Sequence, residues 1–334
     1  ADTLRDTIDA ANYKDYVLPV MFLKYLSDSY ADAVEALSKQ YSGIRLERQK
    51  KYLPFMVAEG CSFYDLYKQR FADNIGQLIN AAMRQIEADN NQQLAGVLSS
   101  VDYNSENALG TREHKNAILR DLLEDFEPLN LRPSVIEIKE GQVPADVIGD
   151  AYEYMIGQFA SMAGKKAGSF YTPAAVSEIM ARIVNVQPGE RVYDPTCGSG
   201  SLLIKAAKKQ NSKEVSIYGQ EVNGSSVAMA KMNMYIHEIR DAKIGWGDTL
   251  ANPVFLDADG NLLLFDAIVA NMPFSKDKWA SGFNPGGESS GKGKKEFKME
   301  ASLDKFHRFD WGVPPASKGD WAFLLHMIAS LSVN

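Results

Sequence analysis

The chain has 334 residues, 45% of them hydrophobic and 24% charged, which is typical of a globular protein with room for two domains. Two cysteines, Cys61 and Cys197, exclude a disulfide-rich class and indicate free thiols in a reducing cytoplasm, and four histidines without a Cys/His cluster argue against a metal site. The formal net charge of −7 excludes a protein that binds nucleic acid through a uniformly basic surface.

The first part of the chain has the pattern of helices. Apolar residues recur at three- and four-residue spacing over residues 17–37, 78–86 and 147–159, which predicts an all-helical first domain over residues 1–163. Pro19 is expected to kink its helix or to lie in the first turn. The most apolar early run, residues 16–26, is too short to cross a bilayer, so no membrane contact is expected. A helical bundle without chemistry would explain most of this region equally well.

The pattern changes near residue 163, where a short basic linker with glycines leads into the second predicted domain, residues 164–334. Thr172 is a good N-cap, and Pro173 suits the first position of a helix expected over residues 173–186. Strands are then expected at residues 191–194, 215–221, 243–246 and 265–270, with helices at residues 201–209 and 225–238. This alternation predicts an α/β fold with a Rossmann-like parallel sheet.

The last part of the second domain is less regular. Residues 275–318 form a long polar loop, and loops of this length are usually functional or disordered. An apolar helix is expected over residues 320–331, after which a doubly wound sheet would normally continue. The sheet is therefore expected to be C-terminally incomplete, with four readable strands.

A glycine turn follows the first predicted strand. The segment from Asp194 through Gly198 and Gly200 to Ser201 ends this strand and opens the next helix. Glycines there let a ligand approach the backbone, and the helix N-terminus offers free N–H groups with partial positive charge. Glu221 ends the next strand, where a carboxylate can accept both hydroxyls of a ribose; its alternative role is to cap the following helix.

These features would also suit a dinucleotide-binding enzyme, but two observations argue against that class. Leu203 stands where the Gly-x-Gly-x-x-Gly spacing requires a third glycine. The fourth strand also leads into Asn271-Met272-Pro273-Phe274, a motif that hydride transfer does not need.

With Asp-Pro-x-x-Gly-Ser-Gly and Asn-x-Pro-Phe in this order, the chain resembles the methyltransferases that modify exocyclic amino groups. More narrowly, it resembles the modification subunits of type I restriction-modification enzymes. Residues 4–28 are similar to the N-terminal helical domain of that family, residues 167–173 to its cofactor motif, and residues 312–323 to the segment before its later helix. The resemblance implies a site-specific DNA methyltransferase that modifies N6 of adenine and uses S-adenosyl-L-methionine.

The resemblance also implies which residues hold this cofactor. Glu221 would hold the ribose, and Asp248, after the third strand, would contact the cofactor's adenine; a turn or capping role is the alternative for Asp248. The other implied contacts come from the segment before the sheet and from the glycine turn: Ser169, Phe170, Tyr171, Thr172, Pro173, Ala174, Asp194, Gly198, Ser199, Gly200 and Ser201.

The implied catalytic residues are Asn271, Met272, Pro273 and Phe274. Adenine N6 is a poor nucleophile because its lone pair is delocalised into the ring. The side-chain oxygen of Asn271 and the carbonyl of residue 272 can accept its two N–H bonds and direct the lone pair at the methyl group. Phe274 offers a face on which a base flipped out of the duplex can stack. Met272 stands where the family usually has proline, which leaves the backbone less restricted, while Pro273 keeps residue 272 extended.

Two other functions stay open at this point. A methyltransferase for glutamine side chains uses a related Asn-Pro-Pro-Tyr site, although Phe274 and the helical first domain favour DNA. The other is a non-catalytic scaffold that binds the cofactor. By resemblance, the partners are double-stranded DNA, a specificity subunit flanked by two copies of this chain, and a restriction subunit. A net charge of −7 agrees with a chain that needs such a partner to bind DNA.

Overall fold

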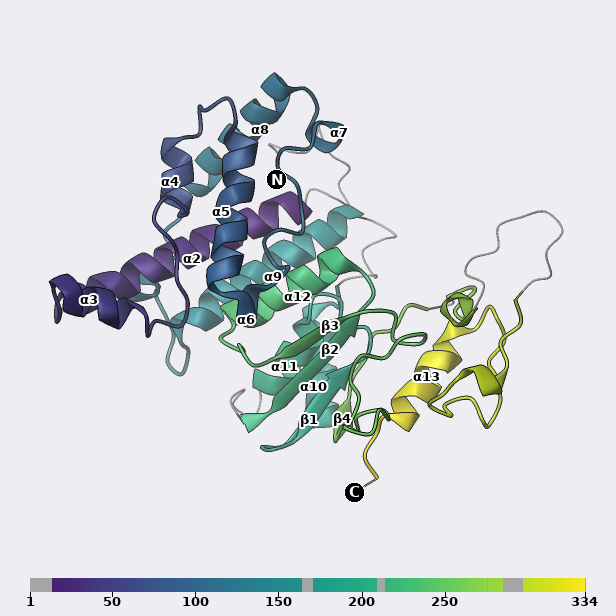
Figure 1. Ribbon diagram of the computed structural model, residues 1–334. Coiled ribbons are helices and arrows are strands. Elements are labelled where there is room, and N and C mark those ends of the chain that lie inside the picture. Colours follow the sequence, from purple (N-terminus) through teal and green to yellow (C-terminus); the bar gives the residue numbers. More distant parts are fainter. Residues whose placement is uncertain (1–13, 164–170, 209–213, 275, 285–296, 334) are drawn as a thin grey trace. The chain divides into compact units, whose positions relative to one another are not determined.

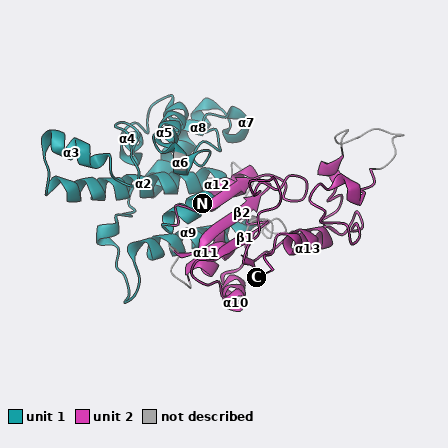
Figure 2. Cartoon of the chain, turned by 60° about the horizontal axis from the view of Figure 1, so that its bottom comes forward, with its two compact units in different colours: residues 1–167, 231–238 teal, residues 168–230, 239–334 magenta. Residues whose placement is uncertain are grey.

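The computed structural model describes residues 14–163, 171–208, 214–274, 276–284 and 297–333. The chain divides into two compact units, coloured separately in Figure 2. Unit 1 comprises residues 1–167 and 231–238, and unit 2 comprises residues 168–230 and 239–334. The expected domain boundary at residue 163 stays a prediction.

Unit 1 is helical in its described residues, which confirms the all-helical pattern of the first region. Its helices are α2 (Lys14–Ser38), α3 (Gly43–Lys50), α4 (Phe63–Lys68), α5 (Ile75–Asp89), α6 (Asn91–Leu94), α7 (Glu106–Leu109), α8 (Arg112–Phe126) and α9 (Pro144–Ala163), with a 3-10 turn at Pro133–Val135. Pro19 lies inside α2, beyond its first turn, so the expectation that it could lie in that turn is wrong.

A buried polar network joins three segments of unit 1. Lys24 and Asp28, one turn apart on α2, form an ion pair of 2.5 Å between Nζ and Oδ2, and both side chains are fully buried. The hydroxyl of Tyr64 on α4 donates to the other oxygen of Asp28, and the N–H of Leu131 donates to Oδ2 at 2.8 Å. Because a buried charge needs partners, this network specifies how α2, α4 and the segment after α8 pack together.

Unit 2 contains a parallel sheet, as predicted. Its strands are β1 (Arg191–Asp194), β2 (Ser216–Glu221), β3 (Lys243–Trp246) and β4 (Ala267–Ile268), in the order β3-β2-β1-β4. Its helices are α10 (Ala174–Val184), α11 (Ser201–Lys208), the first part of α12 (Gly224–Ile236) and α13 (Gly319–Ala329). Helix α11 packs on β1 and β2, and α10 packs against α11 (Figure 1).

Strand β4 is shorter than the expected span of residues 265–270, because only part of it pairs regularly with β1. Phe265 instead pairs in parallel with Leu331, just after α13. The N–H of Phe265 donates to the carbonyl of Ser330 at 2.9 Å, and the N–H of Ser332 donates to the carbonyl of Phe265 at 2.8 Å. In the described residues the sheet has four strands, as expected, and this bridge starts a further parallel pairing beside β4.

Two apolar clusters lie among the described residues of unit 2. An aromatic cluster of Tyr193, Tyr218 and Phe265 lies on the strands, with the rings of Tyr193 and Phe265 stacked at 4.4 Å between centroids. The second, called here the C-terminal cluster, joins the residues after β3 and β4 to α13; its buried members are Leu250, Trp279, Ala280, Met299, Phe309, Ala322 and Phe323. The described parts of the expected long loop, residues 276–284 and 297–318, therefore pack into a core that they share with Leu250 and α13. Among the helices of the described residues, none has the length and apolarity that a membrane span requires.

Candidate functional site

One pocket in unit 2 brings together residues from three separate segments of the sequence. Tyr171 and Thr172 come from the segment before α10, and Asn271 comes from the segment after β4. The turn after β1 and the start of α11 supply the remaining lining residues: Asp194, Thr196, Cys197, Gly198, Ser199, Ser201 and Leu202. The pocket therefore lies at the carboxyl end of the strands, where open parallel sheets bind their ligands.

The turn after β1 needs glycine at two positions. Gly198 and Gly200 have φ angles of +52° and +76°, in the region that side chains disfavour. The strand beneath must also lack a side chain, because a Cβ on Gly219 would lie 2.9 Å from the Cys197 sulfur. The N–H of Cys197 donates to the carbonyl of Gln220 at 3.0 Å, so the turn lies directly on β2.

Glu221, at the end of β2, supports this turn. Its Oε2 accepts the N–H of Gly198 at 3.1 Å, and its Oε1 accepts the N–H of Asn223 at 2.8 Å. Burial raises the pKa of the Glu221 carboxyl, and the hydrogen bonds from these two N–H groups offset part of that rise. The backbone N–H of Val222 also acts on this carboxyl. Because a carboxylate has about four acceptor positions, acceptor capacity is left for a ligand such as a ribose. Glu221 therefore supports both the turn and the start of α12, and still fits a ribose.

Asp194, at the end of β1, is buried in the pocket lining. Burial raises the pKa of its carboxyl to about 7, although the N–H of Thr196 donates to it at 2.9 Å and opposes the rise. The negative charge of Glu221 raises it further. Cys197 beside it is a free thiol whose pKa burial raises well above its usual value, so this sulfur is not an activated nucleophile.

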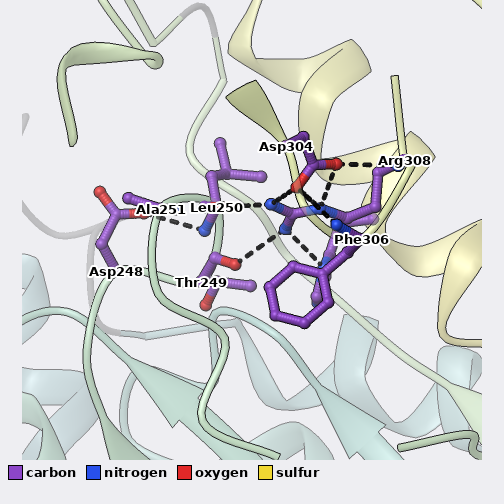
Figure 3. Close-up of polar contacts among 8 residues, drawn as sticks. Asp248, Thr249, Leu250, Ala251, Asp304, Phe306 and Arg308 are labelled. Carbon is purple, nitrogen blue, oxygen red and sulfur yellow. Dashed lines mark hydrogen bonds and ion pairs between the residues drawn. The ribbon is translucent and has the colours of Figure 1, made fainter. Parts of the chain in front are cut away.

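Asp248 follows β3 and caps its own turn. Its Oδ1 accepts the N–H groups of Leu250 at 2.9 Å and Ala251 at 3.2 Å (Figure 3). Asp248 is not among the residues that line the pocket. The turn role that the sequence left open for Asp248 is therefore present, and its contact with a cofactor stays a prediction.

Thr172 has a different local role from the one expected. Helix α10 begins at Ala174, with Pro173 at the N-cap and without a side-chain cap bond, so the prediction of Thr172 as N-cap is wrong. The Thr172 hydroxyl instead accepts a hydrogen bond of 3.1 Å from the side-chain amide of Asn271. This bond joins the predicted cofactor segment to the predicted catalytic motif.

The rest of the motif after β4 has two contrasting environments. Met272 is partly buried and packs against the C-terminal cluster. Pro273 is exposed, and 76% of the Phe274 side chain is open to solvent. The exposed Phe274 ring therefore has a face free for a planar partner, while the partly buried Met272 holds the neighbouring backbone against the cluster.

The structure assembles part of the predicted site. Tyr171, Thr172, Asp194, Gly198, Ser199, Ser201 and Asn271 line one pocket, and Gly200 and Glu221 shape its turn. Pro173 and Ala174 are exposed and outside the lining, while Ser169 and Phe170 lie outside the described residues. Sequence reasoning missed Thr196, Cys197 and Leu202 as lining residues, although they lie within or next to the turn that it identified.

The comparisons with known proteins agree with the resemblance. Residues 143–334 match the family model of the N-6 DNA methylase, and residues 1–126 match that of the HsdM N-terminal domain. The chain is 29% identical to the type I restriction enzyme MpnII methylase subunit of Mycoplasma pneumoniae, covering 98% of this chain and 63% of the relative. It is also 29% identical to the MjaVIII methylase subunit of Methanocaldococcus jannaschii, covering 97% of this chain and 52% of the relative.

A solved structure is similar over almost the whole chain. It is the type I restriction-modification system methyltransferase subunit from Streptococcus thermophilus, with a TM-score of 0.75 and 29% identity, covering 99% of this chain and 70% of that one. The chain thus spans about half to two thirds of the length of the curated relatives that it matches. Because the catalytic family model matches more than half of its residues, the chain belongs to the N-6 DNA methylase family.

Proposed function

We propose that this chain is the methyl-transferring part of a type I restriction-modification enzyme and methylates N6 of adenine in double-stranded DNA. The observation that carries the proposal is the pocket in which Asn271 lies with the glycine turn after β1. A methyl donor held at that turn would present its reactive group beside the side chain that receives the base. The type I methylase subunits among the relatives support the assignment to this class.

The pocket residues fit S-adenosyl-L-methionine. This ligand carries a sulfonium and an amino group, both cationic, and a ribose with two hydroxyls. The lining supplies the buried carboxyl of Asp194, and Glu221 beside it keeps acceptor positions free. The start of α11 supplies N–H groups for the ligand's carboxylate. When bound, the ligand would supply an activated methyl group on a good leaving group.

Asn271 is the residue that would orient the amino group of the base. Because its amide nitrogen donates to Thr172, its side-chain oxygen is the atom left to accept an N–H bond of the base. The main-chain carbonyl of Met272 would accept the second N–H bond. Two acceptors on one amino group make the nitrogen more tetrahedral and aim its lone pair at the methyl group, so catalysis is mainly positioning.

Phe274 would hold the base that has left the duplex. Its ring is exposed beside the motif, and stacking of a base on an aromatic ring contributes about 1–3 kcal/mol. Flipping itself costs a few kcal/mol, so this stack offsets part of that cost. Met272 can replace the usual proline because the task at this position belongs to its carbonyl, while its side chain packs on the C-terminal cluster.

Two alternatives are less well supported. A glutamine methyltransferase would share the chemistry, but the N-6 DNA methylase match over residues 143–334 favours DNA. A non-catalytic scaffold would have no need for the contact between Asn271 and Thr172, which joins the predicted base-binding and cofactor-binding segments.

The proposed partners are DNA, a specificity subunit flanked by two copies of this chain, and a restriction subunit, in the cytoplasm. The net charge of −7 opposes unaided capture of a phosphate backbone, so the isolated chain is expected to bind duplex weakly. Gel-shift titration at physiological salt tests this expectation. Sub-micromolar, sequence-specific binding by the chain alone would contradict the need for a specificity subunit.

Transfer of a labelled methyl group tests the function directly. The chain, mixed with its specificity subunit and a duplex that contains the target sequence, is expected to place the label on adenine N6. Label on a glutamine side chain instead would support the first alternative. Cofactor binding without any transfer, to duplex or to protein, would support the scaffold.

A further inference from the structure

Arg308 is a buried cation that lies outside the predicted site. Only 4% of the residue is exposed, and it follows the 3-10 turn at Ala301–Leu303. Its partner Asp304 is also buried: Nη2 of Arg308 donates to Oδ1 at 2.8 Å, and Nε lies 3.2 and 3.1 Å from Oδ1 and Oδ2. The guanidinium is therefore held in one orientation by a carboxylate one helical turn away in sequence.

The remaining donors of Arg308 reach the turn after β3. Nη1 donates to the carbonyl of Thr249 at 3.2 Å, and Nη2 donates to the carbonyl of Leu250 at 2.5 Å (Figure 3). The same turn is held from its other side by Asp248, whose Oδ1 accepts the N–H groups of Leu250 and Ala251. Arg308 and Asp248 thus bind opposite polar groups of one short turn.

His326 on α13 completes the network. Burial, and then the charge of Arg308, lower the pKa of its ring to about 3, so the ring is neutral at physiological pH. Its Nδ1 lies 3.1 Å from Nη1 of Arg308 and must accept, which leaves the proton on Nε2, 3.3 Å from the hydroxyl of Tyr193. Arg308 is therefore positioned by Asp304 and by His326 on α13, which in turn contacts Tyr193 on β1.

Stability alone does not explain such a network. A buried ion pair pays a desolvation cost that often exceeds its Coulombic gain, and an apolar pair of similar volume is commonly as stable. The C-terminal cluster around the network already contains large apolar side chains, including Phe309 and Leu250. What an apolar pair could not do is donate to the two carbonyls that set the shape of the Asp248 turn.

We propose that Arg308 is a positioning residue for the cofactor: it holds the Asp248 turn so that the Asp248 carboxylate can accept the 6-amino group of the cofactor's adenine. The proposal rests on the function proposed above and adds to it a residue that sets ligand specificity. The hydrogen bonds within the turn use Oδ1 of Asp248, and Oδ2 is the oxygen that we assign to the ligand. A shift of this turn would move that oxygen away from the amino group while leaving the glycine turn and Glu221 in place.

The test compares two ligands whose purines differ in the group at position 6 and in the proton on N1. S-adenosylhomocysteine carries an amino group there, and its deaminated analogue, S-inosylhomocysteine, carries a carbonyl that repels a carboxylate. Calorimetry should show that the wild-type chain prefers the adenine ligand by about 10- to 150-fold, the range for a hydrogen bond to a charged group. Asp248→Asn should lose most of this preference.

Three variants isolate the role of Arg308. Arg308→Lys keeps the charge but loses the forked donors. Asp304→Asn combined with Arg308→Met removes the ion pair without leaving an unpaired buried charge, so it is expected to fold. Arg182→Met removes an exposed arginine that pairs with Glu178 on α10 and serves as the matched control.

The first two variants should bind the inosine ligand as the wild type does and lose the preference for adenine, as Asp248→Asn does. The control should keep the preference. If both ligands weaken by the same factor while the preference survives, Arg308 acts only in stability and the proposal is overturned. If the wild-type chain binds neither ligand, both the proposed function and the proposal for Arg308 fail. If the wild-type chain prefers adenine and the Arg308 variants keep that preference, only the proposal for Arg308 fails.

Discussion

The turn after β1 and the motif after β4 both line the pocket, yet they differ in how far their polar and aromatic groups are satisfied without a ligand. At the turn, Glu221 accepts N–H groups of the turn itself, and Asp194 is buried with a raised pKa. At the motif, the side-chain amide of Asn271 donates to Thr172 and Phe274 is largely exposed. The first region is shaped before any ligand binds, whereas the second is open to a planar substrate.

This difference indicates that the turn binds the cofactor and the motif binds the base. A pre-shaped turn can bind a cofactor at little cost in ordering, because its backbone is already held. An open motif suits a base that must first leave a duplex and then be captured. Changes at the motif should therefore affect transfer, and changes at the turn should affect cofactor affinity.

The largest expected effect comes from Asn271→Ala. Loss of a preorganised acceptor at the reacting group should slow methyl transfer by about 100- to 1,000-fold, the range found for removal of one such group. Cofactor affinity should be unchanged, because the change lies on the open side of the pocket. Single-turnover transfer and calorimetry measure the two effects, with Asn261→Ala in an exposed turn as the control. Loss of cofactor binding in a folded variant would contradict the inference that the motif after β4 affects transfer and the turn after β1 affects cofactor affinity.

Glu221→Ala should have the next largest effect. Removing its contacts to the ribose is expected to weaken S-adenosylmethionine binding by roughly 1.5–3 kcal/mol, or about 10- to 150-fold. The change also leaves the N–H groups of Gly198 and Asn223 without this acceptor, so thermal unfolding must be followed in parallel. A lower melting temperature with unchanged affinity would reduce Glu221 to a support for the turn. Glu178→Gln, on the exposed pair of α10, is the matched control.

The turn after β1 is easier to predict from the sequence than the contacts that surround it, because the turn is formed by residues close together in the chain. A strand that ends in Asp194, glycines at residues 198 and 200 and an acid at the end of the next strand follow from local rules of backbone geometry and parallel sheets. The contact between Thr172 and Asn271 joins residues 99 positions apart, so helix-capping rules gave Thr172 the wrong role. Local propensity carries no information about such a partner.

The network of Arg308 lay beyond sequence reasoning for the same reason. Asp304 and Arg308 have the spacing of an ordinary surface ion pair, and nothing local indicates that both are buried. The two carbonyls that accept from Arg308 are 58 and 59 residues away, and His326 lies on helix α13. Asp304 and Arg308 lie in the segment predicted as a loop, residues 275–318. The described parts of this segment are ordered by apolar packing and not by regular secondary structure, so the sequence pattern did not indicate a buried network there.

A smaller effect is expected in the pH dependence of cofactor affinity, which tests Asp194 beside the turn after β1. Without a ligand the Asp194 carboxyl has a pKa of about 7, and a cationic ligand favours its ionised form. The protonation of Asp194 should therefore lower the affinity for S-adenosylmethionine by up to about tenfold per pH unit below pH 7. Binding near pH 7 should also release a proton, which calorimetry in buffers of different ionisation enthalpy detects.

Asp194→Asn is the reference for this measurement, because the ligand's own amino group also titrates. The variant should release fewer protons and show a flatter affinity profile. Equal proton release by both proteins would mean that Asp194 does not change its charge when the cofactor binds.

The smallest effect is expected at Thr172, and it tests the bond that joins the segment before α10 to the motif after β4. The Thr172 hydroxyl accepts the amide N–H of Asn271 at 3.1 Å, which keeps the amide oxygen available for the base. An amide turned by half a rotation would present its own N–H groups to the amino group and could not accept. A neutral hydrogen bond contributes about 0.5–1.5 kcal/mol, so Thr172→Val should slow single-turnover transfer by about 2- to 12-fold. Thr172→Ser, which keeps the hydroxyl, should restore the rate. If Thr172 serves only as a cofactor contact, Thr172→Val will weaken cofactor affinity and leave the rate at saturating cofactor unchanged. The segment before α10 and the motif would then not be coupled through this bond.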